Sequence, residues 1–163
     1  NATLSLGSVT QAVSSFDPNT SQTKQIGDTA VKFSGIRVTA GSAEALRLWS
    51  IRWNQTGSAG ASDLANLMVY VDGTAYPVTV SSDGKYFTAL FGSGIVIDKG
   101  LSKDIYVQGD IVGAASANRT VQFDIYKIFV KIQVFYFRLF YNIFDACIHK
   151  RDRFYFPFLE YYG

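Results

Sequence analysis

The sequence contains few of the residue types from which catalytic and metal sites are built. Among its 163 residues there is one cysteine, Cys147, and one histidine, His149. A single cysteine excludes a disulfide within the chain, so any extracellular stability must come from a β-core or from assembly. A zinc site needs three or four ligands and would have to recruit Asp145 and Asp152, so we expect no metal there. Cys147 and His149 are two residues apart, and a helix would turn them to different sides, which disfavours a nucleophile and base pair.

Recognisable catalytic and phosphate-binding motifs are also missing. The sequence has no P-loop, no dinucleotide fingerprint and no nucleophile elbow. Residues 1–126 carry nine Lys and Arg against ten Asp and Glu, and residues 127–163 carry six against three, too few for a nucleic-acid footprint. We therefore expect no enzyme, no cofactor and no nucleic-acid partner. A hydrolase is a distant alternative, since it would require an acid pair that the sequence does not single out.

The composition changes abruptly near Tyr126. Residues 1–126 hold 13 of the 14 glycines, whereas residues 127–163 have no serine or threonine and hold 13 of the 25 aromatics. A chain of this length suits one domain with an appendage. We therefore predict an N-terminal segment at 1–28, a β-sandwich module at 29–126 and an aromatic-rich tail at 127–163.

Alternating apolar residues predict β-strands throughout the module. Two Asp-Gly pairs, Asp72-Gly73 and Asp83-Gly84, predict type I′ hairpin turns and hence a meander, because both central residues of such a turn need positive φ. Seven or more short strands at this spacing predict an all-β, antiparallel sandwich of immunoglobulin-like or jelly-roll type. The predicted strands cover 30–38 (with a bulge at Gly35), 46–53, 67–71, 76–80, 85–91, 95–97, 105–107 and 121–126.

The N-terminal segment allows two interpretations. Leu4 and Leu6 alternate as in a strand, and residues 8–15, which include Val9, could add another. The first interpretation is the opening strand of the chain's own sandwich, followed by a loop at Asp17-Pro18-Asn19. The second is a donor strand that completes the sheet of a neighbouring subunit.

Several stretches of the module resemble β-sandwich modules in large secreted surface proteins of candidate-phylum bacteria. The stretches are Ser34 to Glu44, Leu48 to Asn54, Tyr70 to Thr74 and Lys99 to Val107, and the resemblance covers roughly residues 27–127. It implies a β-sandwich exposed at the cell surface and brings no catalytic residues. The architecture is also loosely similar to extracellular fibre subunits that polymerise by strand donation. The chain opens at Asn1 and its only methionine is Met68, which we interpret as removal of a secretion signal or as a fragment of a larger protein.

The tail changes its periodicity along its length. Residues 127–134 alternate and predict one more strand. An amphipathic helix is then predicted by helical spacing of apolar residues, namely Phe137, Phe140, Tyr141, Phe144 and Ile148. A membrane span is disfavoured because charged residues interrupt every window of about 20 residues. A helix lying at a membrane interface fits better, and the same apolar stripe would serve equally to pack on the sandwich. Of the two, contact with a membrane is the less expected. Alternatively, a shifted reading frame would produce such a tail, and then Cys147 and His149 would carry no function.

Exposure would decide the tail's role. Thirteen aromatics in 37 residues cannot stay in water without association. We therefore predict that the tail is buried, either against a partner as an assembly element or on its own domain.

Binding residues can also be proposed from the sequence. Trp49 and Trp53 are candidates for stacking on surface glycans or for contact with a partner, the alternative being core packing. Candidate glycosylation sites are the four sequons, all expected at termini or in loops: Asn1, Asn19, Asn54 and Asn118. Calcium is a more reasonable metal than zinc, because Asp98, Asp104 and Asp110 lie near predicted strand ends. These aspartates match no known loop pattern, and solvated loop aspartates explain them as well.

Together these features predict a non-catalytic, extracellular or cell-surface structural module that works by self-assembly, as a homo-oligomer or filament. The alternative is a carbohydrate-binding or adhesin domain, which would display a row of exposed aromatics beside polar groups.

Overall fold

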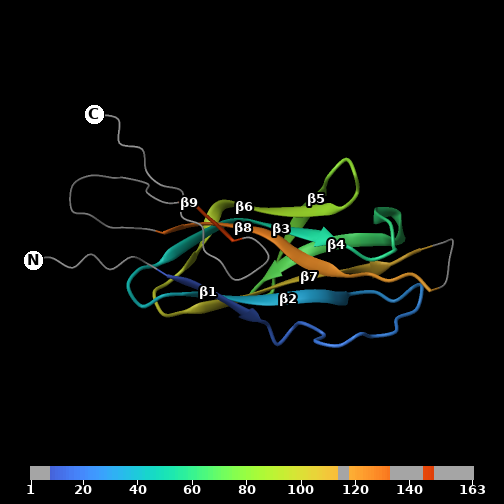
Figure 1. Ribbon diagram of the computed structural model, residues 1–163, viewed down its shortest axis with the longest axis horizontal. Coiled ribbons are helices and arrows are strands. Elements are labelled where there is room, and N and C mark those ends of the chain that lie inside the picture. Colours follow the sequence, from blue (N-terminus) through green and yellow to red (C-terminus); the bar gives the residue numbers. More distant parts are fainter. Residues whose placement is uncertain (1–7, 114–117, 133–144, 149–163) are drawn as a thin grey trace, which may run out of the picture.

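Figure 1 shows a computed structural model that describes residues 8–113, 118–132 and 145–148. The described residues form nine β-strands and one short 3-10 helix, η1 (Ala61–Asp63). The strands are β1 (Val9–Val13), β2 (Val31–Ala40), β3 (Leu46–Gln55), β4 (Leu64–Val71), β5 (Thr74–Val80), β6 (Tyr86–Ile97), β7 (Ser102–Ile111), β8 (Phe123–Ile132) and β9 (Asp145–Ile148). The fold is all-β, as the sequence predicts.

The strands make one antiparallel sheet that curls back on itself into two layers. Its order is β1-β2-β7-β4-β5-β6-β3-β8-β9. We call β1, β2, β7 and β4 layer A, and β6, β3, β8 and β9 layer B (Figure 1). Strand β5 joins the layers, because Thr74 to Pro77 pair with β4 and Val78 to Val80 pair with β6. At the opposite seam the rings of Phe33 and Phe123 meet at 5.5 Å. The antiparallel sandwich is confirmed.

Local turn chemistry explains part of this topology. Asp72 and Gly73 both have positive φ (47° and 84°), so the predicted type I′ turn between β4 and β5 is confirmed. In the second Asp-Gly pair only Gly84 has positive φ, and the Ser81 backbone N–H donates to the Tyr86 carbonyl across a longer loop. The type I′ prediction for that turn is wrong. The runs predicted as separate strands at 85–91 and 95–97 form the single strand β6.

An irregularity in β3 reverses the expected orientation of one tryptophan. Between Leu48 and Ser50 the register of β3 shifts against both neighbouring strands. With strict alternation, Leu46 and Leu48 would lie on one face of β3 and Trp53 on the other. The extra residue at the shift puts Trp53 on the same face as Leu46 and Leu48. All three side chains are 0 to 1% exposed, while Trp49 is half-buried on the other face. Simple alternation along residues 46–53 would predict Trp49 and Trp53 on one face, and the irregularity shows this to be wrong.

The core lies between the two layers. Layer A contributes Val38, Val69, Ile105 and Val107, and layer B contributes Leu48, Ile51, Trp53, Phe87, Ala89, Ile128 and Val130, all 0% exposed. These residues come from six strands, so the core depends on pairings between segments distant in sequence.

Strand β8 crosses the compositional break at Tyr126. The strand predicted before Tyr126 and the extra strand predicted after it are one element, and Ile128 and Val130 lie in the core. Residues 145–148 form β9, whose register sets Cys147 opposite Phe129. The predicted helix is therefore wrong at Asp145 to Ile148. Its other predicted members lie outside the described residues: Phe137, Phe140, Tyr141, Phe144 and His149.

Candidate functional site

Strand β1 forms the edge of layer A and is lightly held by side chains. Its five residues pair with β2 from Val9 opposite Ala40 to Val13 opposite Ile36. Only Val9 is buried; the other four are exposed, and Val13 is 63% exposed. Backbone hydrogen bonds therefore supply most of the attachment of β1 to its own sheet.

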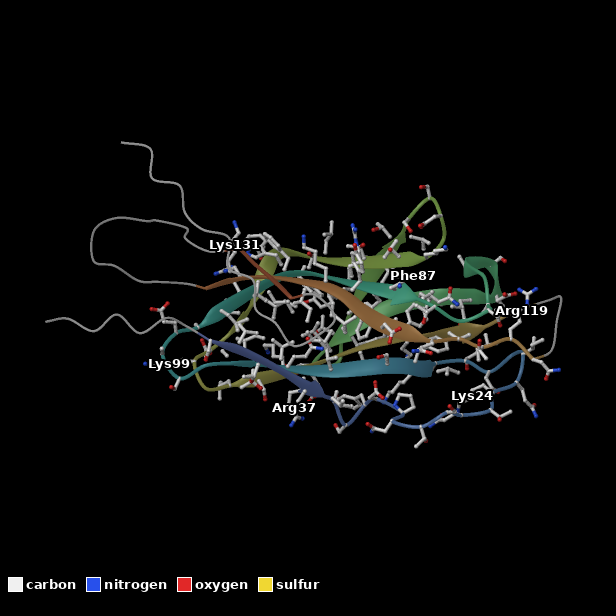
Figure 2. The ribbon with its side chains drawn as sticks, in the orientation of Figure 1. Lys24, Arg37, Phe87, Lys99, Arg119 and Lys131 are labelled. Atoms are coloured by element: carbon white, nitrogen blue, oxygen red, sulfur yellow. The ribbon has the colours of Figure 1, made fainter. Side chains whose placement is uncertain are left out.

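A polar anchor follows β1 on the outer side of layer A. The Ser14 hydroxyl donates to Asp104 Oδ1 at 2.7 Å, and Ser14 is 1% exposed. Arg37, labelled in Figure 2, donates to both oxygens of the same carboxylate, from Nε at 3.0 Å and from Nη2 at 2.7 Å. The hydrogen bond from Arg37 is the largest influence and lowers the pKa of Asp104. Burial opposes it, and the hydrogen bond from Ser14 and the positive charge of Arg37 add smaller lowering effects. This anchor ties the end of β1 to β2 and β7.

A hollow of about 630 Å³ lies between the connection at residues 14–30 and the start of β2. Lys24, Asp28 and Lys32 line it together with Phe16. The Lys32 ammonium lies 4.5 Å from the Phe16 ring centroid and 5.1 Å from that of Tyr106, so cation–π attraction fixes its position. Its lining carries both positive and negative side chains, and these do not form a cluster of metal-ligating groups.

The outer face of layer B carries two groups of aromatic rings with cations. In the first, Tyr86 of β6 and Tyr126 of β8 meet edge to face with centroids 4.8 Å apart. The Arg52 guanidinium lies 6.0 Å from the Tyr86 centroid, and its Nε donates to the Thr88 hydroxyl at 2.9 Å. Cation–π attraction and the hydrogen bond from Nε together hold the guanidinium of this exposed arginine in place.

The second group lies further along the same face. The ammonium of Lys131, a residue labelled in Figure 2, is 5.8 Å from the Trp49 ring centroid and 5.9 Å from the Phe129 centroid. The indole nitrogen of Trp49 is buried and has no hydrogen-bond partner in the described part of the chain. All four rings of the two groups are half-buried, so this is a partly exposed aromatic row beside polar and charged groups, short of the exposed row expected of the carbohydrate-binding alternative.

The structure separates the two predicted tryptophan contacts. Trp49 reaches the outer face of layer B, whereas Trp53 is 0% exposed in the core. The prediction of a glycan or partner contact at Trp53 is wrong, because the bulge in β3 turns it inward.

The sequon asparagines occupy different environments. Asn19 and Asn118 are exposed, with φ of 57° and 70°. Asn54 lies inside β3, half-buried and paired with both Tyr86 and Asp124, so its expected loop position is wrong. Asn1 lies outside the described residues, as do Leu4 and Leu6. Glycosylation at the exposed positions stays a prediction.

The three aspartates proposed for calcium are not brought together. Asp98 precedes β7, Asp104 lies in its first half and Asp110 near its end. Six residues of strand separate Asp104 from Asp110, on the order of 20 Å. Asp98 lies apart from both, in the turn that precedes β7. Asp104 is held by Arg37, and Asp110 accepts from the Asn66 side chain at 2.6 Å. Within residues 8–113, 118–132 and 145–148, no three Asp, Glu, His or Cys side chains gather as metal ligands.

Sequence reasoning did not find the residues that dominate these surfaces. Each of these residues acts through a partner on a neighbouring strand, and local periodicity does not reveal the register between strands. They are Ser14, Arg37, Arg52, Tyr126 and Lys131. Alternation along β8 does mark its outward positions. Nothing in the local sequence indicates that they meet those of β3.

No helix in the described part of the chain has the length and apolar character needed to cross a membrane. Known proteins offer little guidance. No protein-family model matches the chain, and no curated protein matches it in sequence. A solved structure of the pilus backbone of Streptococcus pneumoniae is similar over 78% of this chain, with a TM-score of 0.32 and 14% identity. The chain spans about half of that structure, 52% of its length, and a likeness this weak supports no argument about function.

Proposed function

We propose that this chain is a non-catalytic structural module of an extracellular or cell-surface assembly, in which copies join by exchanging β1. The observation that carries the proposal is the light attachment of β1, an edge strand with one buried side chain. The described chemistry also supports a structural role, because the neighbouring acids Asp72 and Asp104 are each paired with a cation. The hydrolase alternative therefore has no acid pair free for general acid–base work in this region.

The geometry of exchange is favourable. Residues 14–30 connect β1 to β2 and could span on the order of 50 Å when extended. A β1 donated to the β2 edge of a second copy would form the same ladder, the same Val9 contact and the same Ser14 to Asp104 hydrogen bond. Since the contacts are identical, the balance between monomer and assembly depends mainly on linker entropy and protein concentration.

Cysteine pairing on β1 and β2 tests this directly. Thr10 and Thr39 are register partners, so their Cα atoms lie within disulfide range. In a Cys147→Ser background, one chain carries Thr10→Cys and another carries Thr39→Cys, and the two are mixed at high concentration and oxidised. Strand exchange predicts a disulfide-linked heterodimer on non-reducing gels.

A matched pair inside the sheet serves as the control. Thr79 and Thr88 are register partners in the tight β5–β6 hairpin, which has no free edge to exchange. Chains carrying Thr79→Cys and Thr88→Cys should not cross-link when mixed. If the Thr10 and Thr39 chains also fail to cross-link, while the double variant in one chain forms its internal disulfide, β1 stays on its own sheet and the proposal fails.

The surface location stays a prediction, and so does the expectation that the tail makes no main contact with a membrane. The assembly roles also stay predictions for the residues named from the sequence: Leu4, Leu6, Phe137, Phe140, Tyr141 and Phe144.

A further inference from the structure

The two outer faces of the molecule differ in how their charges are balanced. On layer A, Arg37 pairs with Asp104 at 2.7 Å and Lys103 with Asp72 at 2.6 Å. On layer B, among side chains that the structure describes, one carboxylate accompanies four cations: Asp124 against Arg47, Arg52, Lys127 and Lys131. Strand β9 sets Asp145 opposite Lys131 in its register. Two cations of layer A are thus paired with carboxylates, whereas on layer B cations outnumber carboxylates among the side chains that the structure describes.

The two arginines of layer B donate hydrogen bonds to uncharged acceptors. Arg47 Nη1 donates to the Ser93 carbonyl at 2.7 Å, and Arg52 Nε donates to the Thr88 hydroxyl at 2.9 Å. In the described part of the chain no carboxylate pairs with Arg52. Its Nη groups remain as donors in a planar arrangement that matches a carboxylate.

Register places these cations between the two aromatic groups. Arg52 pairs across β6 with Thr88 and across β8 with Lys127, forming one polar row, and both Arg52 and Lys127 are exposed. On one side of the row lie Tyr86 and Tyr126. On the other side lie Trp49 and Phe129, about 10 Å along the strand at three residues' rise. The face therefore alternates ring, cation and ring along β3.

We propose that this face binds an acidic polysaccharide whose negative groups are carboxylates. Sugar rings have apolar faces that pack on aromatic side chains, and the two aromatic groups offer two such positions. A carboxylate on the chain between them would reach Arg52 and Lys127 in the central row. Neutral polysaccharides would leave these cations unpaired, which gives the acidic polymer its preference.

The small number of cations on this face argues against nucleic acid as its ligand. The face has four, and the whole chain has a formal net charge of +2, far from the dense basic stripe that phosphate backbones require. This second polyanion nevertheless shares both stacking and charge, so it belongs in the test.

Titration calorimetry of the full chain separates these chemistries with four probes. They are polygalacturonate, the same polymer with its carboxyls methyl-esterified, dextran sulfate, and single-stranded DNA. We expect binding of polygalacturonate that weakens in high salt, and much weaker binding of the esterified polymer. The proposal would be overturned if polygalacturonate does not bind, or if the esterified polymer binds equally well. It would also be overturned if DNA binds more tightly, or if dextran sulfate is the one probe that binds.

Charge-matched variants locate the site. Arg52→Gln with Lys127→Gln should weaken polygalacturonate binding about three- to tenfold, since each exposed ion pair contributes little. Lys99→Gln with Lys103→Gln removes the same charge at a turn and on layer A and should leave the affinity unchanged. Tyr86→Ala should also weaken binding, with circular dichroism confirming that the variant is folded. If both double variants lose affinity equally, or if Tyr86→Ala loses none, binding reflects general charge attraction and the assignment of the site is wrong.

Discussion

Arg37 and Asp104 face each other as register partners on β2 and β7, and two hydrogen bonds join the guanidinium to the carboxylate. The hydroxyl of Ser14, directly after β1, donates to the same carboxylate. One acidic side chain therefore links three segments that are far apart in the sequence. Its protonation state bears on the attachment of the edge strand.

Stability should fall in acid, and Asp104 should account for part of the fall. Its pKa in the folded protein lies below the unfolded value of about 3.9, so the unfolded chain takes up the proton first as the pH drops. The stabilisation is complete well above pH 4 and is lost as the pH falls through the folded pKa. Thermal unfolding followed by circular dichroism from pH 7 to pH 3 measures this.

A variant series isolates the contribution of Asp104. The hydrogen bonds of Asp63 and Asp110 also lower the pKa of each of those groups, so Asp104→Asn should reduce the acid slope without abolishing it. Asp98→Asn, at an exposed turn, removes the same charge and serves as the control against which the change in slope is compared. An unaltered slope in Asp104→Asn would contradict the role assigned to the anchor.

The two tryptophans should respond very differently to truncation. Trp53→Ala removes a fully buried ring and should cost about 3–5 kcal/mol in the free energy of unfolding, whereas Trp49→Ala should cost clearly less. Urea denaturation gives both values. Fluorescence adds an independent check, because the single tryptophan left in Trp49→Phe should emit at short wavelength and resist quenching by acrylamide. Similar losses in the two alanine variants would mean that the bulge in β3 is misplaced.

Strand β8 offers a test of whether the sandwich continues past Tyr126. Ile128 is fully buried and Lys127 beside it is exposed. We expect Ile128→Ala to destabilise by about 2–5 kcal/mol and Lys127→Ala to change stability by less than about 0.5 kcal/mol. Chemical denaturation of both variants gives the comparison, and a neutral Ile128→Ala would place the end of the module before this residue.

Gly57 should not tolerate a side chain. A Cβ at this position would collide with the carbonyl oxygen of Thr120, so we expect Gly57→Ala to cost about 1–3 kcal/mol. Gly60 has an extended backbone, and its nearest neighbour to an added Cβ is 3.7 Å away. Gly60→Ala should be neutral or gain about 0.4–1 kcal/mol. Melting temperatures that rank the two variants in the opposite order would contradict the packing of the loop after β3 on the segment before β8.

Fold class and the central meander could be predicted from the sequence. Alternating runs separated by Asp72-Gly73 and Asp83-Gly84 gave strands β4, β5 and β6 in order, because adjacent strands joined by short turns pair locally. Prediction failed where one inserted residue changes the parity of a strand, as between Leu48 and Ser50. It also failed at Asp145 to Ile148, where apolar residues at helical spacing belong to a strand that pairs with β8.

The sequence by itself determined that this chain is built of antiparallel strands, because side-chain alternation and turn residues act over a few positions. Only the tertiary structure decided which strands are neighbours and therefore which side chains meet. The anchor of Ser14, Arg37 and Asp104 and the row of Thr88, Arg52 and Lys127 exist because pairing joins residues from distant parts of the chain. Hydrogen bonds between backbones set that register, and the burial of Trp53, Ile128 and their core neighbours selects it.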